Sequence, residues 1–201
     1  MTLLKSRPAR GSKQNARQIK RNAQPAVEPE RCTVFSTELG WILVSWQGDA
    51  LTLISFGHAS PAAAAQRGTT EPVEADEAPK WIKQLSGQIQ RFSQGKQVDW
   101  GKVPLQWPSR TAFQQKVQEA CRQIPRGQVR SYGELAAAVG APGAARAVGS
   151  VMRTNRFPLI IPCHRVVASG GNLGGFSCPQ GIDVKQKLLA LEGVQLRTKG
   201  K

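Results

Sequence analysis

Three apolar runs separated by two tight-turn signals occupy residues 32–56 and restrict this stretch to a small antiparallel sheet. The sequence there is CTVFSTELGWILVSWQGDALTLISF, and its turn signals are Glu38-Leu39-Gly40 and Gln47-Gly48-Asp49. Apolar, β-branched and aromatic side chains flank both turns, as is typical of strands joined in hairpins. The pattern predicts two linked hairpins, which together form a three-stranded meander.

Helical signals begin after this region. Residues 60–78 predict a short helix followed by a loop. Residues 79–94 predict a longer helix that ends at Gly95, a favourable residue just beyond a helix C-terminus. Its apolar side chains recur at helical spacing: Trp81, Ile82, Leu85, Ile89 and Phe92. A linker that contains Pro104 and Pro108 separates this part from the rest of the chain.

The second half predicts a helix-turn-helix. A first helix ends before Pro125 and has one apolar stripe, made of Phe113, Val117, Cys121 and Ile124. Ser131-Tyr132-Gly133-Glu134 is a capping box that opens a short helix ending at Gly140. Pro142 predicts the start of another helix, because proline is tolerated at the first helical position. Two short helices joined by a tight turn form the motif.

The last of these helices has two different faces. At 3.6 residues per turn, Ala144, Val148, Val151 and Met152 share one face. The opposite face carries Arg146, Gly149, Ser150 and Arg153. Small residues let a helix backbone approach a surface closely, and arginine supplies positive charge, so this face suits entry into a DNA groove. An ordinary solvated helix face is the alternative.

The charge distribution points in the same direction. The net charge is +15, of which residues 1–31 carry +6, residues 32–109 carry −1 and residues 110–201 carry +10. A basic half beside a near-neutral one favours binding of a polyanion, first of all nucleic acid; generic solubility charge is the alternative. Residues 1–30 have the composition of a disordered basic tail, which would either contact phosphates or only aid solubility.

Other function classes fit the sequence poorly. The four cysteines include no Cys-x-x-Cys pair and there are only two histidines, so we expect no disulfide framework and no metal site. The chain has neither an apolar run long enough to span a membrane nor a secretory signal at its start. We therefore expect no membrane partner and a reducing, cytoplasmic setting, with nucleoid association if the source is bacterial.

The run IPCHRVV, residues 161–167, combines a thiol with a base. We expect a strand here, on which neighbouring Cys163 and His164 point to opposite sides and cannot pair directly. A water could then relay the proton between them. Glu192 is predicted to lie in the last turn of a helix, where the dipole disfavours an anion. As a partner of His164 it would help to form a thiolate, since an unperturbed thiol is only a few per cent ionised at pH 7. An ordinary surface glutamate is the alternative.

The C-terminal region resembles the O6-alkylguanine-DNA alkyltransferases. The resemblance covers roughly residues 109–197, and residues 32–95 resemble the family's variable N-terminal domain less closely. Its motifs are RSYGELA, ARAVG, Asn155, IPCHRVV and the terminal K-x-x-LL-x-x-EG. We therefore expect an α/β (α+β) protein with a small N-terminal α/β domain at 31–104, built on an antiparallel sheet. A mostly helical, winged-helix-like domain with the helix-turn-helix would follow at 109–197.

The resemblance implies a role for each matching residue. Cys163 would be the alkyl acceptor and His164, held by Glu192, would deprotonate it through water. Asn155 would fix the recognition helix, and Tyr132 would press on the 3′ phosphate and donate toward the guanine. The remaining predicted site residues are Pro158, Val166, Phe176 and Ser177 for substrate and Arg146, Ala145, Gly149 and Ser150 for DNA, with Arg146 replacing the flipped base.

The implied activity is DNA repair. The alkyl group of O6-alkylguanine, and of O4-alkylthymine, would move irreversibly to the protein's own cysteine, once per molecule, without a cofactor. The partner would be double-stranded DNA, entered from the minor groove with the damaged base flipped, and the protein would act as a monomer. The alternatives are a non-catalytic lesion sensor, which would lack the cysteine, and a transcription regulator, which would not explain the PCHR motif.

Three features depart from the family pattern. Phe176 stands where relatives often have tyrosine, so one hydroxyl contact is missing. The segment FSCPQGID is longer than the corresponding loop of some relatives and places Cys178 near the site, either as a plain loop thiol or close to Cys163. Cys32 and His58 do not form the N-terminal zinc set of many relatives, so we predict no zinc.

Overall fold

The computed structural model describes residues 28–195. Its N-terminal half is a sheet of three antiparallel strands in the order β1 (Arg31–Thr37), β2 (Gly40–Gln47) and β3 (Ala50–His58). Each neighbouring pair is joined by a short turn, which confirms the predicted meander. Residues 1–27, which contain most of the predicted basic tail, lie outside the described residues.

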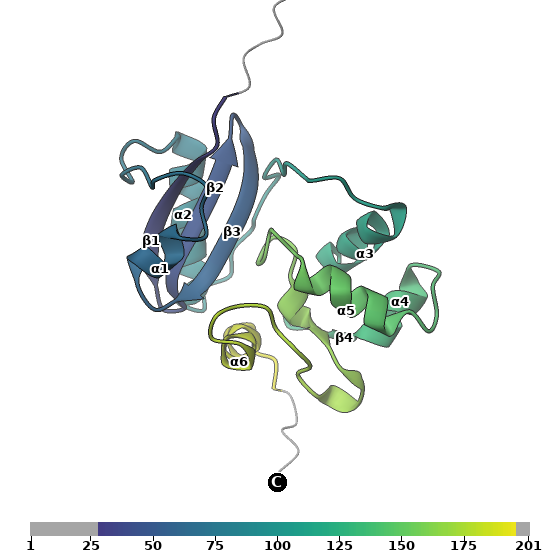
Figure 1. Ribbon diagram of the computed structural model, residues 1–201. Coiled ribbons are helices and arrows are strands. Elements are labelled where there is room, and N and C mark those ends of the chain that lie inside the picture. The colour runs from purple at the N-terminus through teal and green to yellow at the C-terminus, as the bar shows by residue number, and fades with distance from the viewer. Residues whose placement is uncertain (1–27, 196–201) are drawn as a thin grey trace, which may run out of the picture.

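Two helices cover opposite faces of this sheet (Figure 1). Helix α2 (Lys80–Ser93) packs its apolar stripe against one face, and it ends before Gly95, whose φ of 78° supports the predicted helix stop. The short helix α1 (Pro61–Ala65) covers the other face, where Ala64 joins a small cluster with Cys32 and Leu43. The alternation of β2 explains this: Leu43 faces α1, whereas Ile42 and Val44 belong to the main core.

The C-terminal half is mostly helical (Figure 1). The helices are α3 (Ala112–Arg122), α4 (Tyr132–Ala138), α5 (Ala145–Arg153) and α6 (Ile182–Leu191). Two-residue strands β4 (Arg130–Ser131) and β5 (Val166–Val167) pair in parallel. A short 3₁₀ helix lies on each side of β5 in the sequence, η1 (Cys163–Arg165) before it and η2 (Ser169–Gly171) after it. The expected capping box is present: Ser131 and Glu134 bond each other's backbone N–H at the start of α4.

The recognition helix begins three residues later than expected. Pro142 is not its first residue; α5 starts at Ala145. Gly143 has φ of +90°, which is incompatible with a right-handed helix, so Pro142 and Gly143 form the turn instead. The predicted faces of this helix are otherwise present, because Val148, Val151 and Met152 are its buried residues.

The strand expected around Cys163 is also absent. The chain turns at Leu159, a non-glycine residue with φ of 73°, and Cys163 opens η1 rather than lying on a strand. Pro158 and Pro162 have no N–H to donate to a sheet. Local bonds satisfy the backbone between them, from Ile161 N to Phe157 O at 2.8 Å and from Cys163 N to Ile161 O at 2.7 Å.

Backbone hydrogen bonds join the two halves near the site. Ile54 N of β3 donates to Arg156 O at 2.8 Å, and the side chain of Arg156 donates in return to Thr52 O at 2.9 Å. Within residues 28–195, no helix combines the length and apolar character that crossing a membrane requires.

Candidate active site

Cys163 lies at the first position of η1 and is almost buried, with 7% of its surface exposed. The chain reaches it through the tight turns described above, so its position is fixed by backbone bonds on both sides. Its own carbonyl accepts a hydrogen bond from Val166 N, where η1 passes into β5. The thiol is thus presented by a rigid turn rather than by a strand.

Asn155 connects this turn to the recognition helix. It lies just after α5, and its Nδ2 donates to Ile161 O at 2.9 Å. Its Oδ1 accepts from Phe157 N at 3.0 Å. One side chain therefore fixes both the chain that leaves α5 and the chain that approaches Cys163.

Glu192 joins two side chains of η1. Its Oε1 lies 2.9 Å from His164 Nε2, and Arg165 donates to the same carboxylate through Nε at 2.8 Å and Nη2 at 2.7 Å. The carboxylate is supplied by the residue that caps α6, so helix α6 places it against η1. The side chain of Glu192 is fully enclosed, which makes this an ion pair shielded from solvent.

The hydrogen bonds of this cluster determine where its protons lie. Burial tends to raise the pKa of Glu192, but the bonds from His164 and Arg165 outweigh it and hold that pKa at about 2. Burial lowers the pKa of His164, so its imidazole is neutral near pH 7. An ionised carboxylate only accepts, so Nε2 carries the imidazole proton and Nδ1 has the free lone pair. Nδ1 is buried and has no hydrogen-bond partner among the described residues.

The thiol itself is held in its neutral form at rest. Burial raises the pKa of Cys163, and a hydrogen bond from Asn155 and the charge of Lys185 only partly offset this. Ionisation at neutral pH therefore needs a base, and the next residue of η1, His164, carries one at its Nδ1, which is unpartnered among the described residues. The arrangement suits a nucleophile that ionises only during reaction.

Tyr132 forms one wall of the site. It is the first residue of α4, and its ring lies between Gly149 of α5 and Gly174 of the glycine-rich loop, which spans residues 170–175. A Cβ at Gly174 would approach the Tyr132 ring to 3.0 Å, and Gly174 also has φ of +68°, so both sterics and backbone conformation require glycine there. Tyr132 Oη donates to Gly175 O at 3.4 Å.

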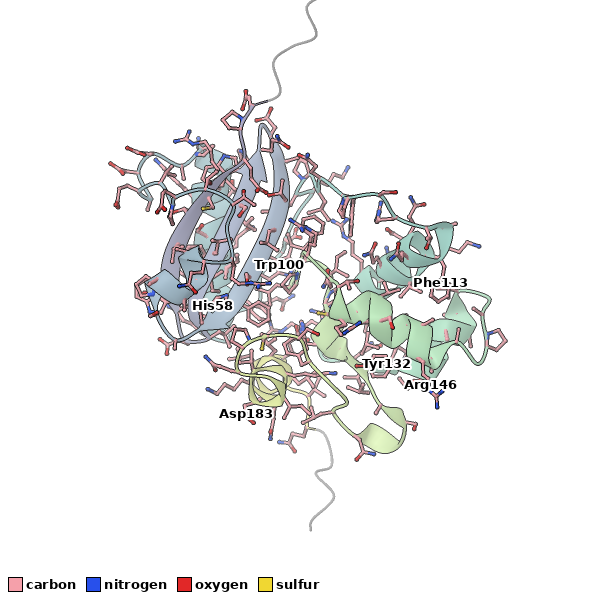
Figure 2. All side chains as sticks on the ribbon, in the orientation of Figure 1. His58, Trp100, Phe113, Tyr132, Arg146 and Asp183 are labelled. Carbon is pink, nitrogen blue, oxygen red and sulfur yellow. The ribbon has the colours of Figure 1, made fainter. Side chains whose placement is uncertain are left out.

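A cavity of about 690 Å³ opens between α4, α5 and the glycine-rich loop, and we name it the helix-side cavity. It brings together most of the predicted site residues: Tyr132, Ala145, Arg146, Gly149, Cys163, Phe176 and Ser177. Figure 2 shows Tyr132 and Arg146 on this helical half of the molecule. Asn155 and Pro158 line a neighbouring cavity, and neither Ser150 nor Val166 lines the helix-side cavity. His164 and Glu192 are buried and line neither cavity.

Two residues that the sequence reasoning did not assign belong to the site. Lys185 is fully buried, and its Nζ donates to the carbonyls of Val166 and Leu173, each at 2.6 Å. Burial lowers the pKa of Lys185 to about 8, and the nearby Cys163 opposes that shift. Arg165 is the second, through its bonds to Glu192.

A sequence signal existed for both residues. Lys185 precedes Leu188, Leu189 and Glu192 by three, four and seven positions, so all four share one helix face, and a charged residue on an apolar face is unusual. Arg165 interrupts an apolar run in the same way.

No group of three or more His, Cys, Asp or Glu side chains suited to a metal ion occurs between residues 28 and 195. Cys32 and His58 serve separate local contacts: Cys32 Sγ donates to Thr70 O at 3.3 Å, and His58 Nε2 bonds Ser55 Oγ at 2.8 Å. The absence of a structural zinc stays a prediction.

Known proteins share this chain's sequence and fold. Residues 112–194 match the family described as 6-O-methylguanine DNA methyltransferase, DNA binding domain. A methylated-DNA–protein-cysteine methyltransferase of Methanosarcina acetivorans is 32% identical over 160 residues, which cover 80% of this chain and 96% of the relative. The constitutive enzyme of that name from Bacillus subtilis is 32% identical over 167 residues, 83% of this chain and 98% of the relative.

A solved structure agrees with these relatives. The crystal structure of Mycobacterium tuberculosis OGT in complex with DNA superposes with a TM-score of 0.67 at 33% identity, and the match covers 81% of this chain and 92% of that one. The likeness extends over both the sheet-bearing half and the helical half. The chain belongs to the methylated-DNA–protein-cysteine methyltransferase family.

Proposed function

We propose that this protein repairs O6-alkylguanine in double-stranded DNA by transferring the alkyl group irreversibly to Cys163. The observation that carries the proposal is the position of Cys163, which lines the helix-side cavity beside the buried cluster of His164 and Glu192. Family membership supports the same reaction. A thioether has no easy route of hydrolysis, so each molecule acts once.

DNA would approach through the exposed face of α5. Arg146 and Ser150 are exposed there, while Gly149 keeps the helix surface low enough for close approach to a minor groove. The alkyl carbon of a stacked guanine is inaccessible, so the nucleotide must leave the duplex and enter the helix-side cavity. Arg146, at the cavity rim, would fill the space that the base leaves. A single molecule carries all these parts, which supports action as a monomer.

The residues of η1 would carry out the proton transfer. His164 Nδ1 would accept the thiol proton of Cys163 through one water, while Glu192 stabilises the imidazolium that forms. The thiolate then attacks the alkyl carbon in line with the departing O6. Tyr132 and the Ser177 backbone would hydrogen-bond the guanine as it leaves, which makes it a better leaving group.

A single-turnover experiment tests this function. The protein is incubated with a duplex that contains one O6-methylguanine, and intact-protein and peptide mass spectrometry then locate the transferred methyl group. We expect one methyl group per molecule, on Cys163, and none in Cys163→Ala. Cys178→Ala is the matched control, because Cys178 lies in the adjacent cavity, and it should still accept the group at Cys163.

The same experiment tests the alternative of a non-catalytic lesion sensor. Tight binding of the damaged duplex by the unmodified protein, with the methyl group still on guanine after long incubation, would favour the sensor and contradict transfer.

A further inference from the structure

A second cavity of about 850 Å³ lies between β3, the end of α1 and the chain around the site, and we name it the sheet-side cavity. Five residues line both cavities: Met152, Arg153, Cys163, Phe176 and Ser177. The acceptor cysteine therefore lies where the two cavities meet. The guanine accounts only for the helix-side cavity. The residues predicted to contact the substrate include Pro158, Phe176 and Ser177 of the sheet-side cavity, but the proposed function names no group that fills the rest of it.

Part of the wall of the sheet-side cavity is apolar. Phe56 of β3 packs against Phe176, with 6.0 Å between the ring centroids. Pro158 and Cys178 contribute to the same wall. At Gly57, next to Phe56, an added Cβ would lie 3.7 Å from Cys178 Sγ, so the sheet approaches the loop after Ser177 closely. This part suits a short hydrocarbon chain.

Another part of the wall is basic. Arg67, Arg153 and Arg156 line it and are exposed. Arg156 uses its Nε for Thr52 O, and among the described residues every ion pair involves Glu192, so none of the three guanidinium groups has a carboxylate partner. Glu30 is the one acidic residue of the wall, and the hydroxyls of Thr52 and Thr69 already bond its carboxylate. We name the three arginines the basic rim.

His58 adds a neutral polar group to this wall. It lies at the end of β3 on the sheet half of the molecule (Figure 2). Burial and the charge of Arg67, which lines the same cavity, lower the pKa of His58. The positive charge of the cavity at neutral pH therefore comes from the arginines.

We propose that the sheet-side cavity binds the distal end of the transferred group, and that its basic rim favours alkyl groups that end in a carboxylate. This rests on the proposed function. In-line attack places sulfur, carbon and O6 on one axis, so the rest of the alkyl chain extends from the carbon at an angle to that axis. The guanine occupies the helix-side cavity, and the sheet-side cavity is the other space that adjoins Cys163. The preferred lesions are thus O6-(ω-carboxyalkyl)guanines several carbons long.

The transfer balances without a further reactant. The Cys163 sulfur forms a bond to the carbon attached to O6, and the C–O6 bond breaks with its electron pair on guanine. The thiol proton, passed through His164, ends on guanine. The products are unmodified guanine in DNA and a carboxyalkyl thioether whose carboxylate stays ionised against the basic rim.

Matched substrates test the proposal. Duplexes of one sequence carry O6-methylguanine, O6-(3-carboxypropyl)guanine or its neutral analogue O6-(3-carbamoylpropyl)guanine, and the single-turnover rate of each is measured with the full chain. Partly exposed ion pairs contribute about 0.2–1 kcal/mol, so we expect the carboxylate to react up to about fivefold faster than the amide. Arg67→Gln removes one of the three rim charges and should reduce this preference without slowing transfer of methyl. Arg91→Gln, an exposed arginine on α2 outside both cavities, is the matched control and should change neither rate.

Each other outcome has a defined meaning. Equal rates for carboxylate and amide, or a preference that Arg67→Gln does not reduce, would overturn the proposal. Normal methyl transfer in the same experiment would leave the proposed function standing. Failure of the unmodified protein to transfer the methyl group at all would overturn the proposed function. If Arg67→Gln slowed all three substrates alike and weakened binding of undamaged duplex, the rim would be a phosphate contact and the proposal would be wrong.

Discussion

Lys185 donates from its buried ammonium to the carbonyl oxygen of Val166 at 2.6 Å, and this bond ties α6 to the strand that follows the acceptor turn. The same ammonium bonds Leu173 O at 2.6 Å and Gly175 O at 3.4 Å. It therefore holds the glycine-rich loop against η1. The ammonium also lies 5.7 Å from the centroid of the Tyr132 ring, so it supports the cavity wall as well.

Replacing Lys185 should loosen this loop. Lys185→Met keeps the length of the side chain but leaves the buried carbonyls without their donor, which we expect to lower the free energy of unfolding by about 1–3 kcal/mol. Transfer should slow, and hydrogen exchange should rise in residues 169–177 more than elsewhere. Lys187→Met changes an exposed lysine of the same helix and should do neither. Unchanged exchange in the loop would contradict this role.

Glu192 should matter for both stability and rate. Glu192→Gln leaves the Arg165 charge buried without its partner, and breaking a buried ion pair in this way costs about 3–5 kcal/mol. It also removes the anion that stabilises the imidazolium of His164, so we expect transfer to slow by about 10²-fold or more. The measurements are denaturant unfolding and the single-turnover rate at a temperature where the variant is folded.

Glu119→Gln is the control for that comparison, because Glu119 is exposed on α3. It should leave both quantities unchanged. A folded Glu192→Gln protein that transfers methyl at the normal rate would contradict the proposed role of Glu192 in stabilising the His164 imidazolium.

The two histidines predict how stability depends on pH. The pKa values of His58 and His164 are both lowered in the folded protein, chiefly by burial. Histidines in the unfolded chain have a pKa of about 6.5 and become protonated below that pH. The same histidines in the folded protein stay neutral, so the unfolded chain binds more protons. The free energy of unfolding should fall as the pH drops from 7 toward 5.5, by at most about 1.4 kcal/mol per pH unit for each histidine.

Urea unfolding at several pH values measures this slope. The chain has only these two histidines, so His58→Gln should leave a smaller slope that belongs to His164. If the stability of His58→Gln stayed flat or rose on acidification across this range, the pKa of His164 would not be lowered in the folded protein.

The parts of the fold that the sequence predicted depend on local signals. The hairpins of β1 to β3 follow from alternation and turn residues, and the start of α4 follows from the capping box of Ser131 and Glu134. These signals act over a few residues and are not altered by distant packing. The end of α2 was predicted for the same reason, since Gly95 has a positive φ.

The errors occur where distant packing decides the conformation. Residues 157–167 are all buried, so their apolar character gives no period that separates a strand from a turn and a 3₁₀ helix. The prolines in this run were the available warning against a strand. The contribution of Phe56 to the acceptor site could not be predicted, because it requires β3 to approach a loop more than a hundred residues later.

Arg146 should separate base flipping from chemistry. It is exposed on α5 at the rim of the helix-side cavity, so Arg146→Ala removes the group proposed to replace the flipped base. Extrusion of a base costs a few kcal/mol, and Arg146 is proposed to offset part of this cost. Without it, transfer from duplex DNA should slow by about 10- to 100-fold. Reaction with free O6-benzylguanine needs no flipping and should keep its rate. Rates with both substrates, measured for this variant and for Arg91→Ala, check the prediction; an equal loss with both would place Arg146 in the chemical step instead.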